Sequence, residues 1–329
     1  MKSETDSIAA GMRMPTFEGA LEARARIAPY GVTGTPLYRW PGLERVLGAE
    51  VWVKHENHQP VAAFKVRGGV NLVSQLSDDE RAAGVIAAST GNHGQSIAFA
   101  AKLFGVRARI VVPEGANPVK VQAIQDFGAE VIVHGGDFDD AREHCEALAE
   151  EHGHRYINSG NEPHLIEGVA TYTIEILEEQ PDVDLVVVPI GGGSGASGAC
   201  IAGKSMKPSL QVIGVQAAAA PAAFHSWRQR RLVTDEMKTS AEGLATRAAF
   251  ELPQRILWEQ LDDFLLVSEE DLRVAVRDML EATRNLVELS GAAALAGAKK
   301  IKDRLAGKKI ALIASGSNIS LDQLRSILA

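Results

Sequence analysis

Short runs of continuous apolar residues alternate along this chain with longer stretches in which apolar residues recur every three or four positions. The apolar runs lie at residues 85–88, 110–112, 131–133, 185–188, 212–215 and 310–313. Strands that are apolar on both faces are typical of a parallel sheet covered by helices on both sides. The periodic stretches, as at residues 97–104, 166–177 and 276–287, predict those helices. The alternation therefore predicts α/β architecture with mainly parallel strands.

The length of 329 residues suits about two domains. No internal repeat or Pro/Ser-rich linker divides the chain, so we expect the two domains to be interwoven. Residues 1–72 and 160–329 are predicted to form the larger domain and residues 73–159 the smaller one. A polar loop at residues 159–163 is the expected crossing point.

Composition excludes several classes of partner. The formal net charge of −8 argues against binding to nucleic acid or to an anionic membrane surface. No run approaches the roughly 20 apolar residues that span a bilayer, and residues 1–13 lack the apolar core of a signal peptide. The two cysteines, Cys145 and Cys200, fit no metal spacing, so a reducing, cytoplasmic setting is expected.

One lysine, Lys65, follows the segment 62–64 (Ala-Ala-Phe). It precedes a predicted helix with Val66, Val70 and Val73 on one face. A lone lysine is usually a solvated surface residue. If this one points inward at the helix N-terminus, the helix dipole and burial both lower its pKa from about 10.4. The resulting neutral amine can form a Schiff base with an aldehyde. The sequence leaves both interpretations open.

A glycine-rich turn follows the strand predicted at residues 185–188. It consists of Gly191, Gly192, Gly193, Ser194 and Gly195, and a helix of small residues comes next. Backbone N–H groups in such a turn bind anions such as phosphate. No Lys-Ser/Thr pair follows, which excludes a nucleotide-triphosphate loop. A flexible loop is the alternative, and a phosphate cradle suits a flavin, a sugar phosphate or pyridoxal phosphate equally.

Two further polar turns follow predicted strands. Ser89, Thr90, Gly91, Asn92 and His93 come after residues 85–88, at a strand end where α/β folds bind ligands, and suit a carboxylate. Plain helix capping is the alternative, and His93 is either a base or a packed histidine. The second turn begins at Ser315, after residues 310–313, and its hydroxyl either hydrogen-bonds a ring nitrogen or belongs to an ordinary turn.

Together and in this order, the four motifs resemble those of fold-type II pyridoxal-phosphate enzymes, in the group of threonine ammonia-lyases, serine dehydratases and serine racemases. The resemblance runs from about Thr33 to Asn318. It implies a fold like that of the tryptophan synthase β-subunit, with two interwoven, open, mostly parallel sheets. Pyridoxal 5′-phosphate would lie on the larger domain and the substrate loop on the smaller one. A homodimer acting on a small amino acid is also implied.

The resemblance assigns roles to single residues. Those implied to bind the cofactor are Phe64, Lys65, Asn92, Gly191, Gly192, Gly193, Ser194, Gly195 and Ser315. Those implied to bind the substrate are Ser89, Thr90, Gly91, Asn92 and His93. Lys65 would remove the α-proton, the β-hydroxyl would leave with help from the cofactor phosphate, and the product would hydrolyse to a 2-oxo acid and ammonia.

Several residues depart from the family pattern. Ala62 and Ala63 replace Gly-Ser before the lysine, and Ser194 replaces a fourth glycine. Gln216 stands where many relatives carry a carboxylate for a cation, so we expect no strong metal site. These changes suggest a 3-hydroxy amino acid bulkier than threonine. The chain ends soon after Asn318, so we also expect no feedback inhibition by isoleucine.

Other activities stay open at this stage. Thr90 is a hydroxyl residue where serine racemases use one, so it is a candidate catalytic residue and an amino-acid racemase is the first alternative. A β-replacing synthase is the second. A cofactor-binding protein without activity is the third, against which Lys65, Asn92 and Ser315 argue.

Overall fold

Two sheets organise residues 13–329, the part of the chain that the computed structural model describes. One sheet has the strand order β1-β2-β10-β7-β8-β9 and the other β5-β4-β3-β6. Among the named strands of residues 13–329, β1–β2 is the one antiparallel pair. The strands are β1 (Leu37–Arg39), β2 (Glu50–Lys54), β3 (Val85–Ala88), β4 (Ala108–Val112), β5 (Glu130–Val133), β6 (Arg155–Tyr156), β7 (Leu185–Pro189), β8 (Gln211–Ala217), β9 (Asp263–Val267) and β10 (Lys309–Ile313).

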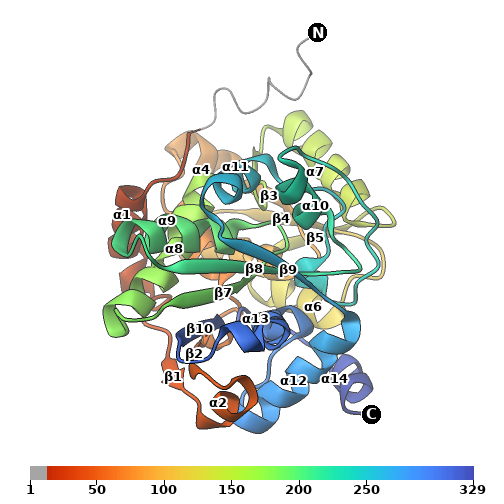
Figure 1. Cartoon of the computed structure of the whole chain (residues 1–329). Helices are drawn as coiled ribbons and strands as arrows, with labels where there is room; N and C mark the ends of the chain where they lie inside the picture. The colour runs from red at the N-terminus through yellow and green to blue at the C-terminus, as the bar shows by residue number, and fades with distance from the viewer. Residues whose placement is uncertain (1–12) are drawn as a thin grey trace.

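Helices cover both sheets (Figure 1). They are α1 (Phe17–Ile27), α2 (Pro41–Leu47), α3 (Lys65–Val73), α4 (Asp78–Ala83), α5 (Asn92–Phe104), α6 (Pro118–Asp126), α7 (Phe138–His152), α8 (Pro163–Glu179), α9 (Ser194–Met206), α10 (Ala222–Gln229), α11 (Glu251–Gln260), α12 (Glu269–Thr283), α13 (Leu289–Lys300) and α14 (Leu321–Leu328). The 3-10 turns are η2 (Ala28–Tyr30), η3 (Glu56–His58), η4 (Glu242–Leu244) and η5 (Lys302–Arg304). Within residues 13–329, no helix is both long and apolar enough to cross a membrane.

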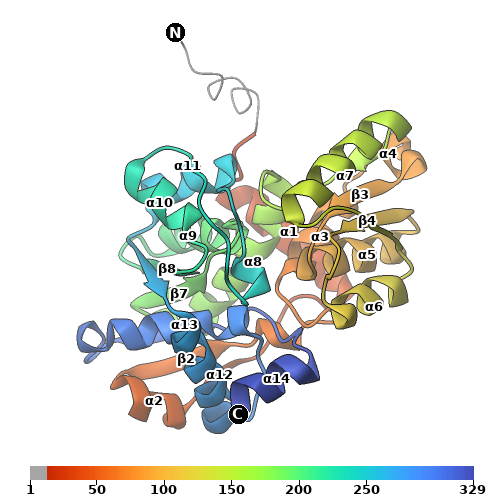
Figure 2. The same ribbon diagram turned by 90° about the vertical axis from the view of Figure 1, so that its right-hand side faces the viewer.

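The two sheets define two lobes, which Figure 2 shows side by side. The small lobe contains β3–β6 with α4–α7, and the large lobe contains β1, β2 and β7–β10 with α2 and α8–α14. Helix α3 packs against both α5 and α8, and its Val66 and Val70 share a core with Val85 and Ile97 of the small lobe. The predicted domain boundaries remain a prediction, and residues 1–12 of the larger domain lie outside the described residues.

The α/β fold with two mostly parallel sheets is confirmed, and each of the six apolar runs is a strand. These strands are easy to recognise because most of their residues are buried; β3, for example, is buried throughout. One helix prediction was too long. The period of three to four residues continues to Val287, but α12 ends at Thr283 because Arg284 adopts a left-handed conformation with φ 59°. Val287 is instead buried in the connection to α13.

Helices α3, α8 and α9 touch backbone to backbone. A Cβ atom built on Gly68 would lie 2.7 Å from the carbonyl oxygen of Leu165, and one on Gly168 would lie 2.6 Å from that of Arg67. Between α8 and α9, a Cβ on Gly198 would lie 2.8 Å from the backbone nitrogen of Ala170. Only glycine permits contacts this close, so the three helices form one interlocked frame. Lys65 begins α3 and is therefore fixed to that frame.

A buried ion network lies at the first turn of α3. The guanidinium of Arg67 donates to both oxygens of Glu56, each at 2.8 Å, and to those of Glu175 at 2.7 and 2.8 Å. Lys54 pairs with Glu175 at 2.6 Å, and the Thr35 hydroxyl accepts from Arg67 at 3.0 Å. All five residues are buried. Such a network tolerates burial because each charge is paired and hydrogen-bonded.

Candidate active site

The loops that follow β3, β7 and β10 meet the start of α3 at a single cavity. Every predicted site residue lines it: Phe64, Lys65, Ser89, Thr90, Gly91, Asn92, His93, Gly191, Gly192, Gly193, Ser194, Gly195 and Ser315. Parallel strands bring their carboxyl ends to one edge of a sheet, and this is why loops so far apart in sequence converge. The roles of these residues remain predictions, but their common location is a structural finding.

The amine of Lys65 lies between the glycine-rich turn and the loop after β6. Its Nζ donates to the hydroxyl of Ser194 at 2.9 Å and to the carbonyl oxygen of Ser159 at 3.3 Å. Burial lowers the pKa of Lys65 to about 8, because an ammonium loses hydration inside the cavity. Compared with the ordinary value of 10.5, this leaves much more of the amine neutral at physiological pH. The inward-pointing interpretation of Lys65 thus fits the structure.

The glycine-rich turn leads directly into α9, with Gly193 at φ 92° as the residue before the helix. A Cβ on Gly191 would lie 2.1 Å from the carbonyl oxygen of Gly243, and one on Gly195 would lie 3.2 Å from the hydroxyl of Tyr172. The backbone of the turn therefore packs directly against neighbouring groups, in the space that side chains would otherwise occupy. The N–H groups of a first helical turn have no partners inside the helix and attract anions. The residues present fit a phosphate group.

The polar loop after β3 caps the start of α5, and its carboxylate-binding role remains a prediction. The hydroxyl of Ser89 accepts hydrogen bonds from the backbone nitrogens of Gly91 and Gly94, at 2.9 and 2.8 Å, so it caps the start of α5. A serine hydroxyl also has one O–H to donate, which leaves Ser89 able to hold a carboxylate. Thr90 is half-buried on the cavity wall.

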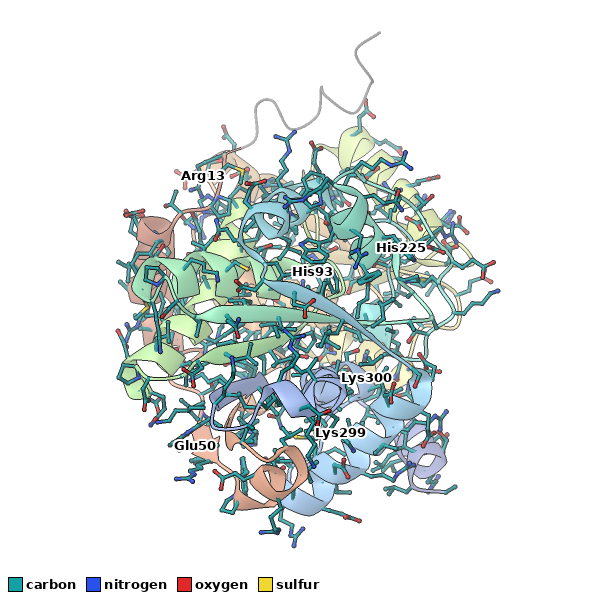
Figure 3. The ribbon with its side chains drawn as sticks, in the orientation of Figure 1. Arg13, Glu50, His93, His225, Lys299 and Lys300 are labelled. Atoms are coloured by element: carbon teal, nitrogen blue, oxygen red, sulfur yellow. The ribbon has the colours of Figure 1, made fainter. Side chains whose placement is uncertain are left out.

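His93 is a packed histidine. It is buried, and Figure 3 shows it near the middle of the view, whereas Arg13 and Glu50 lie at the edge. Its Nε2 lies 3.4 Å from the carbonyl oxygen of Ile157, and its Nδ1 has no protein partner. Burial first, and then the charge of Lys65, lower the pKa of His93 to about 3. The ring is therefore neutral at physiological pH and is a weak base.

Asn92 and Ser315 are held by hydrogen bonds from the large lobe. The Asn92 amide donates to Glu288 Oε1 at 2.6 Å, and its oxygen accepts from Asn318 Nδ2 at 2.9 Å. The Ser315 hydroxyl donates to the carbonyl oxygen of Ser290 at 3.4 Å. The Ser315 carbonyl oxygen in turn accepts from the backbone nitrogen of Phe64 at 3.0 Å. The C-terminal turn is thus tied to the residue before Lys65.

Sequence reasoning missed several residues that line the cavity. Lys120 pairs there with Glu242 at 2.7 Å and Glu288 at 2.9 Å, and Phe138 and Phe250 contribute aromatic rings. The segments around residues 120 and 288 match the family, but nothing in their local pattern indicates an ion pair across 168 positions. Only the fold brings these residues together.

Gln216 lies buried near the carboxyl end of β8, where its Oε1 accepts from the backbone nitrogen of Phe224 at 3.0 Å. In residues 13–329, no group of three or more His, Cys, Asp or Glu side chains is arranged to hold a metal ion. The expectation that no strong metal site exists stays a prediction.

A family model described as "Pyridoxal-phosphate dependent enzyme" matches residues 28–316. The chain belongs to this family. It is 39% identical over 96% of its length to an L-threonine ammonia-lyase of Thermotoga maritima, 78% of which is covered. It is 38% identical over 97% of its length to an L-threo-3-hydroxyaspartate ammonia-lyase of Saccharomyces cerevisiae, 98% of which is covered. The structure of maize serine racemase superposes with a TM-score of 0.90 at 30% identity, covering 96% of this chain and 97% of that one.

Membership of the family confirms three predictions. The fold is fold-type II, the cofactor is pyridoxal 5′-phosphate, and the protein is an enzyme of the lyase class represented by the two ammonia-lyases. The cavity fits this cofactor, because it has an amine at Lys65 and an anion-binding helix start at Ser194.

Proposed function

We propose that this enzyme eliminates water from a 3-hydroxy amino acid of the threonine or serine type, releasing a 2-oxo acid and ammonia. The observation that carries the proposal is the position of Lys65. Its amine, with a pKa of about 8, lies in one cavity with the glycine-rich turn, to which we assign the cofactor phosphate, and the polar loop after β3, to which we assign the substrate carboxylate. The named activities of the two ammonia-lyase relatives support it.

When bound, pyridoxal phosphate supplies a ring that withdraws electrons from the α-carbon of the substrate. The residues of the chain do the remaining work. The neutral Nζ of Lys65 accepts the α-proton, while Ser89 and Thr90 orient the substrate carboxylate. Ser315, which lines the cavity, would offer the ring nitrogen of the cofactor a neutral hydroxyl rather than a carboxylate, and an unprotonated ring would suit elimination at the β-carbon.

Part of the cavity lining favours a substrate with a bulky, apolar β-substituent. Phe138 of the small lobe and Leu244, Thr246 and Phe250 of the large lobe line it. Aromatic and aliphatic walls bind apolar groups through burial of surface. A side chain larger than the methyl group of threonine is therefore part of the proposal.

The proposal extends to setting and assembly. We place the enzyme as a homodimer in a reducing cytoplasm, acting on a small amino acid without nucleic acid or membrane as partner. Both Cys145 and Cys200 are buried free thiols, and burial raises the pKa of Cys145 to about 12, so neither is a reactive nucleophile. The homodimer rests on family resemblance.

Release of 2-oxo acid from a substrate panel tests the activity. The panel holds L-serine, L-threonine, D-serine, 3-hydroxyaspartate and 3-phenylserine, assayed with the purified holoenzyme. We expect turnover of at least one member, with 3-phenylserine above L-threonine, and a loss of at least 1,000-fold in Lys65→Ala because the general base is removed. Lys102→Ala, an exposed lysine on α5, is the control and should retain full activity.

Other outcomes of the substrate panel would indicate a different activity or a different substrate preference. Formation of a D-amino acid without 2-oxo acid would replace the proposal with the racemase, for which the hydroxyl of Thr90 on the cavity wall is the supporting observation. A product that requires added sulfide or thiol would indicate a β-replacing synthase. Turnover of L-threonine equal to or above that of 3-phenylserine would remove the bulky-substrate element alone.

A further inference from the structure

Lys120 is a buried lysine of the small lobe whose charge is held by the large lobe. It lies on α6 and is 2% exposed. Its Nζ is 2.9 Å from Glu288 Oε2 and 2.7 Å from Glu242 Oε2, and both carboxylates come from the large lobe. Lysine is almost never fully buried without a partner, so this pairing holds α6 against the large lobe.

Glu288 uses its two oxygens for different partners. Oε2 accepts from Lys120, while Oε1 accepts from the side-chain amide of Asn92 at 2.6 Å. Its backbone nitrogen donates to the carbonyl oxygen of Gly316 at 3.1 Å, which fixes Glu288 within the large lobe. Asn92 and Lys120 both belong to the small lobe and are both buried or half-buried at the cavity. One carboxylate thus holds two separate points of the opposite lobe.

We propose that Glu288 is a clamp that ties the contact between the two lobes to the orientation of Asn92, with Lys120 as the positioning residue that acts through it. This inference rests on the proposed function and on the predicted role of Asn92 in binding the cofactor. A carboxylate has two acceptor oxygens and no donor, so it serves the ammonium and the amide together. Glutamine has one acceptor and serves only one of them. Charge-assisted hydrogen bonds of this kind are also stronger than neutral ones.

The position of Lys120 adds a second constraint on the loop. A Cβ built on Gly91 would lie 2.3 Å from Cδ of Lys120, so the lysine stem packs directly on the backbone beside Asn92. Lys120 therefore supports Asn92 from two sides, through its stem at Gly91 and through its charge at Glu288.

Cofactor binding gives the first test. Pyridoxal phosphate is titrated into cofactor-free protein and followed by absorbance, for the unaltered chain, Lys120→Met, Lys120→Arg and Lys102→Met. We expect Lys120→Met to weaken binding about tenfold, Lys120→Arg to recover most of the loss because it restores the charge, and Lys102→Met to change nothing. Binding by Lys120→Met within twofold of the unaltered chain would overturn the clamp.

A double-mutant cycle without cofactor gives the second test. Lys120→Met, Asn92→Ala and the double variant are unfolded by denaturant in the cofactor-free state. Asn92 and Lys120 share Glu288, so the double variant should lose less stability than the sum of the single losses. Strict additivity would contradict the coupling. This test needs neither turnover nor cofactor, so an inactive substrate panel would end the proposed function without deciding the clamp.

Discussion

Two buried ion clusters hold this enzyme together, and they differ in balance and in place. The Arg67 cluster has two cations, Arg67 and Lys54, and two carboxylates, Glu56 and Glu175. The Lys120 cluster has one cation and two carboxylates. The first lies beneath the interlocked helices, far from solvent, whereas the second lines the cavity between the lobes.

The difference shows how charge is used in each place. A balanced cluster with every donor satisfied is a permanent part of the frame, because opening it would expose four charges to an apolar interior. The Lys120 cluster lies at a cavity and has one surplus negative charge, so both of its carboxylates depend on a single cation. We therefore expect the first cluster to determine whether the chain folds and the second to determine how the site is arranged.

Arg67→Met should give the largest effect. Removing the guanidinium leaves Glu56 and Glu175 buried with most of their partners lost, which costs about 3–5 kcal/mol of unfolding free energy. Denaturant unfolding monitored by circular dichroism measures it, and Glu175→Gln serves as a second variant if Arg67→Met does not accumulate. A loss below about 1 kcal/mol in both variants would show that the cluster is dispensable.

Titration should separate the two clusters by pH. Burial alone would raise the pKa of Glu175, but hydrogen bonds and charge from Arg67 and Lys54 outweigh it and lower the pKa to about 2, from 4.5. A carboxylate with a lowered folded-state pKa stabilises the fold above its unfolded pKa and loses that contribution as the pH falls. The stability difference between the unaltered chain and Glu175→Gln should therefore shrink between about pH 4.5 and 2.

The pKa of Lys120 is raised, whereas that of Glu175 is lowered. Burial lowers the pKa of Lys120, but the charges of Glu288 and Glu242 outweigh it, so the pKa lies above 10.5. A group with a raised folded-state pKa contributes fully below its unfolded pKa, and its contribution is lost as the pH rises through the folded-state value. The difference between the unaltered chain and Lys120→Met should therefore shrink in alkali, above about pH 10.5, where the Glu175→Gln difference stays constant. A Lys120→Met difference that stays constant to the alkaline limit of the folded protein would show that the charge of Lys120 does not stabilise the fold.

An exposed ion pair should give the smallest loss of unfolding free energy in this comparison. Arg24 on α1 donates to Glu178 on α8 at 2.7 Å, at the surface. Water and salt weaken such a pair, so Arg24→Ala should cost about 0.5 kcal/mol or less. The same unfolding experiment measures it. A loss as large as that of Arg67→Met would mean that burial does not distinguish the clusters.

The sequence predicts the parts of the fold that are encoded locally. Buried strands such as β3 and β7 appear as apolar runs, and each polar turn that follows such a strand reaches the cavity. β6, with two half-buried residues, is too short to leave such a run. β9 does carry an apolar run at residues 264–267, which was not recognised as a strand. The ion clusters leave no signal at all. Arg67 and Glu175 are 108 positions apart, and Lys120 and Glu288 are 168 apart.

The glycine contacts among α3, α8 and α9 also limit how such an enzyme can diverge. Gly68, Gly168 and Gly198 leave no volume for any side chain. Substitutions there would destabilise the fold and lower the amount of folded enzyme, whatever their effect on the reaction. Phe138, Leu244, Thr246 and Phe250 line the cavity with side chains, so substitutions there change the shape of the cavity directly. A change in substrate preference is thus easier to reach through these lining side chains than through the glycine frame on which Lys65 is fixed.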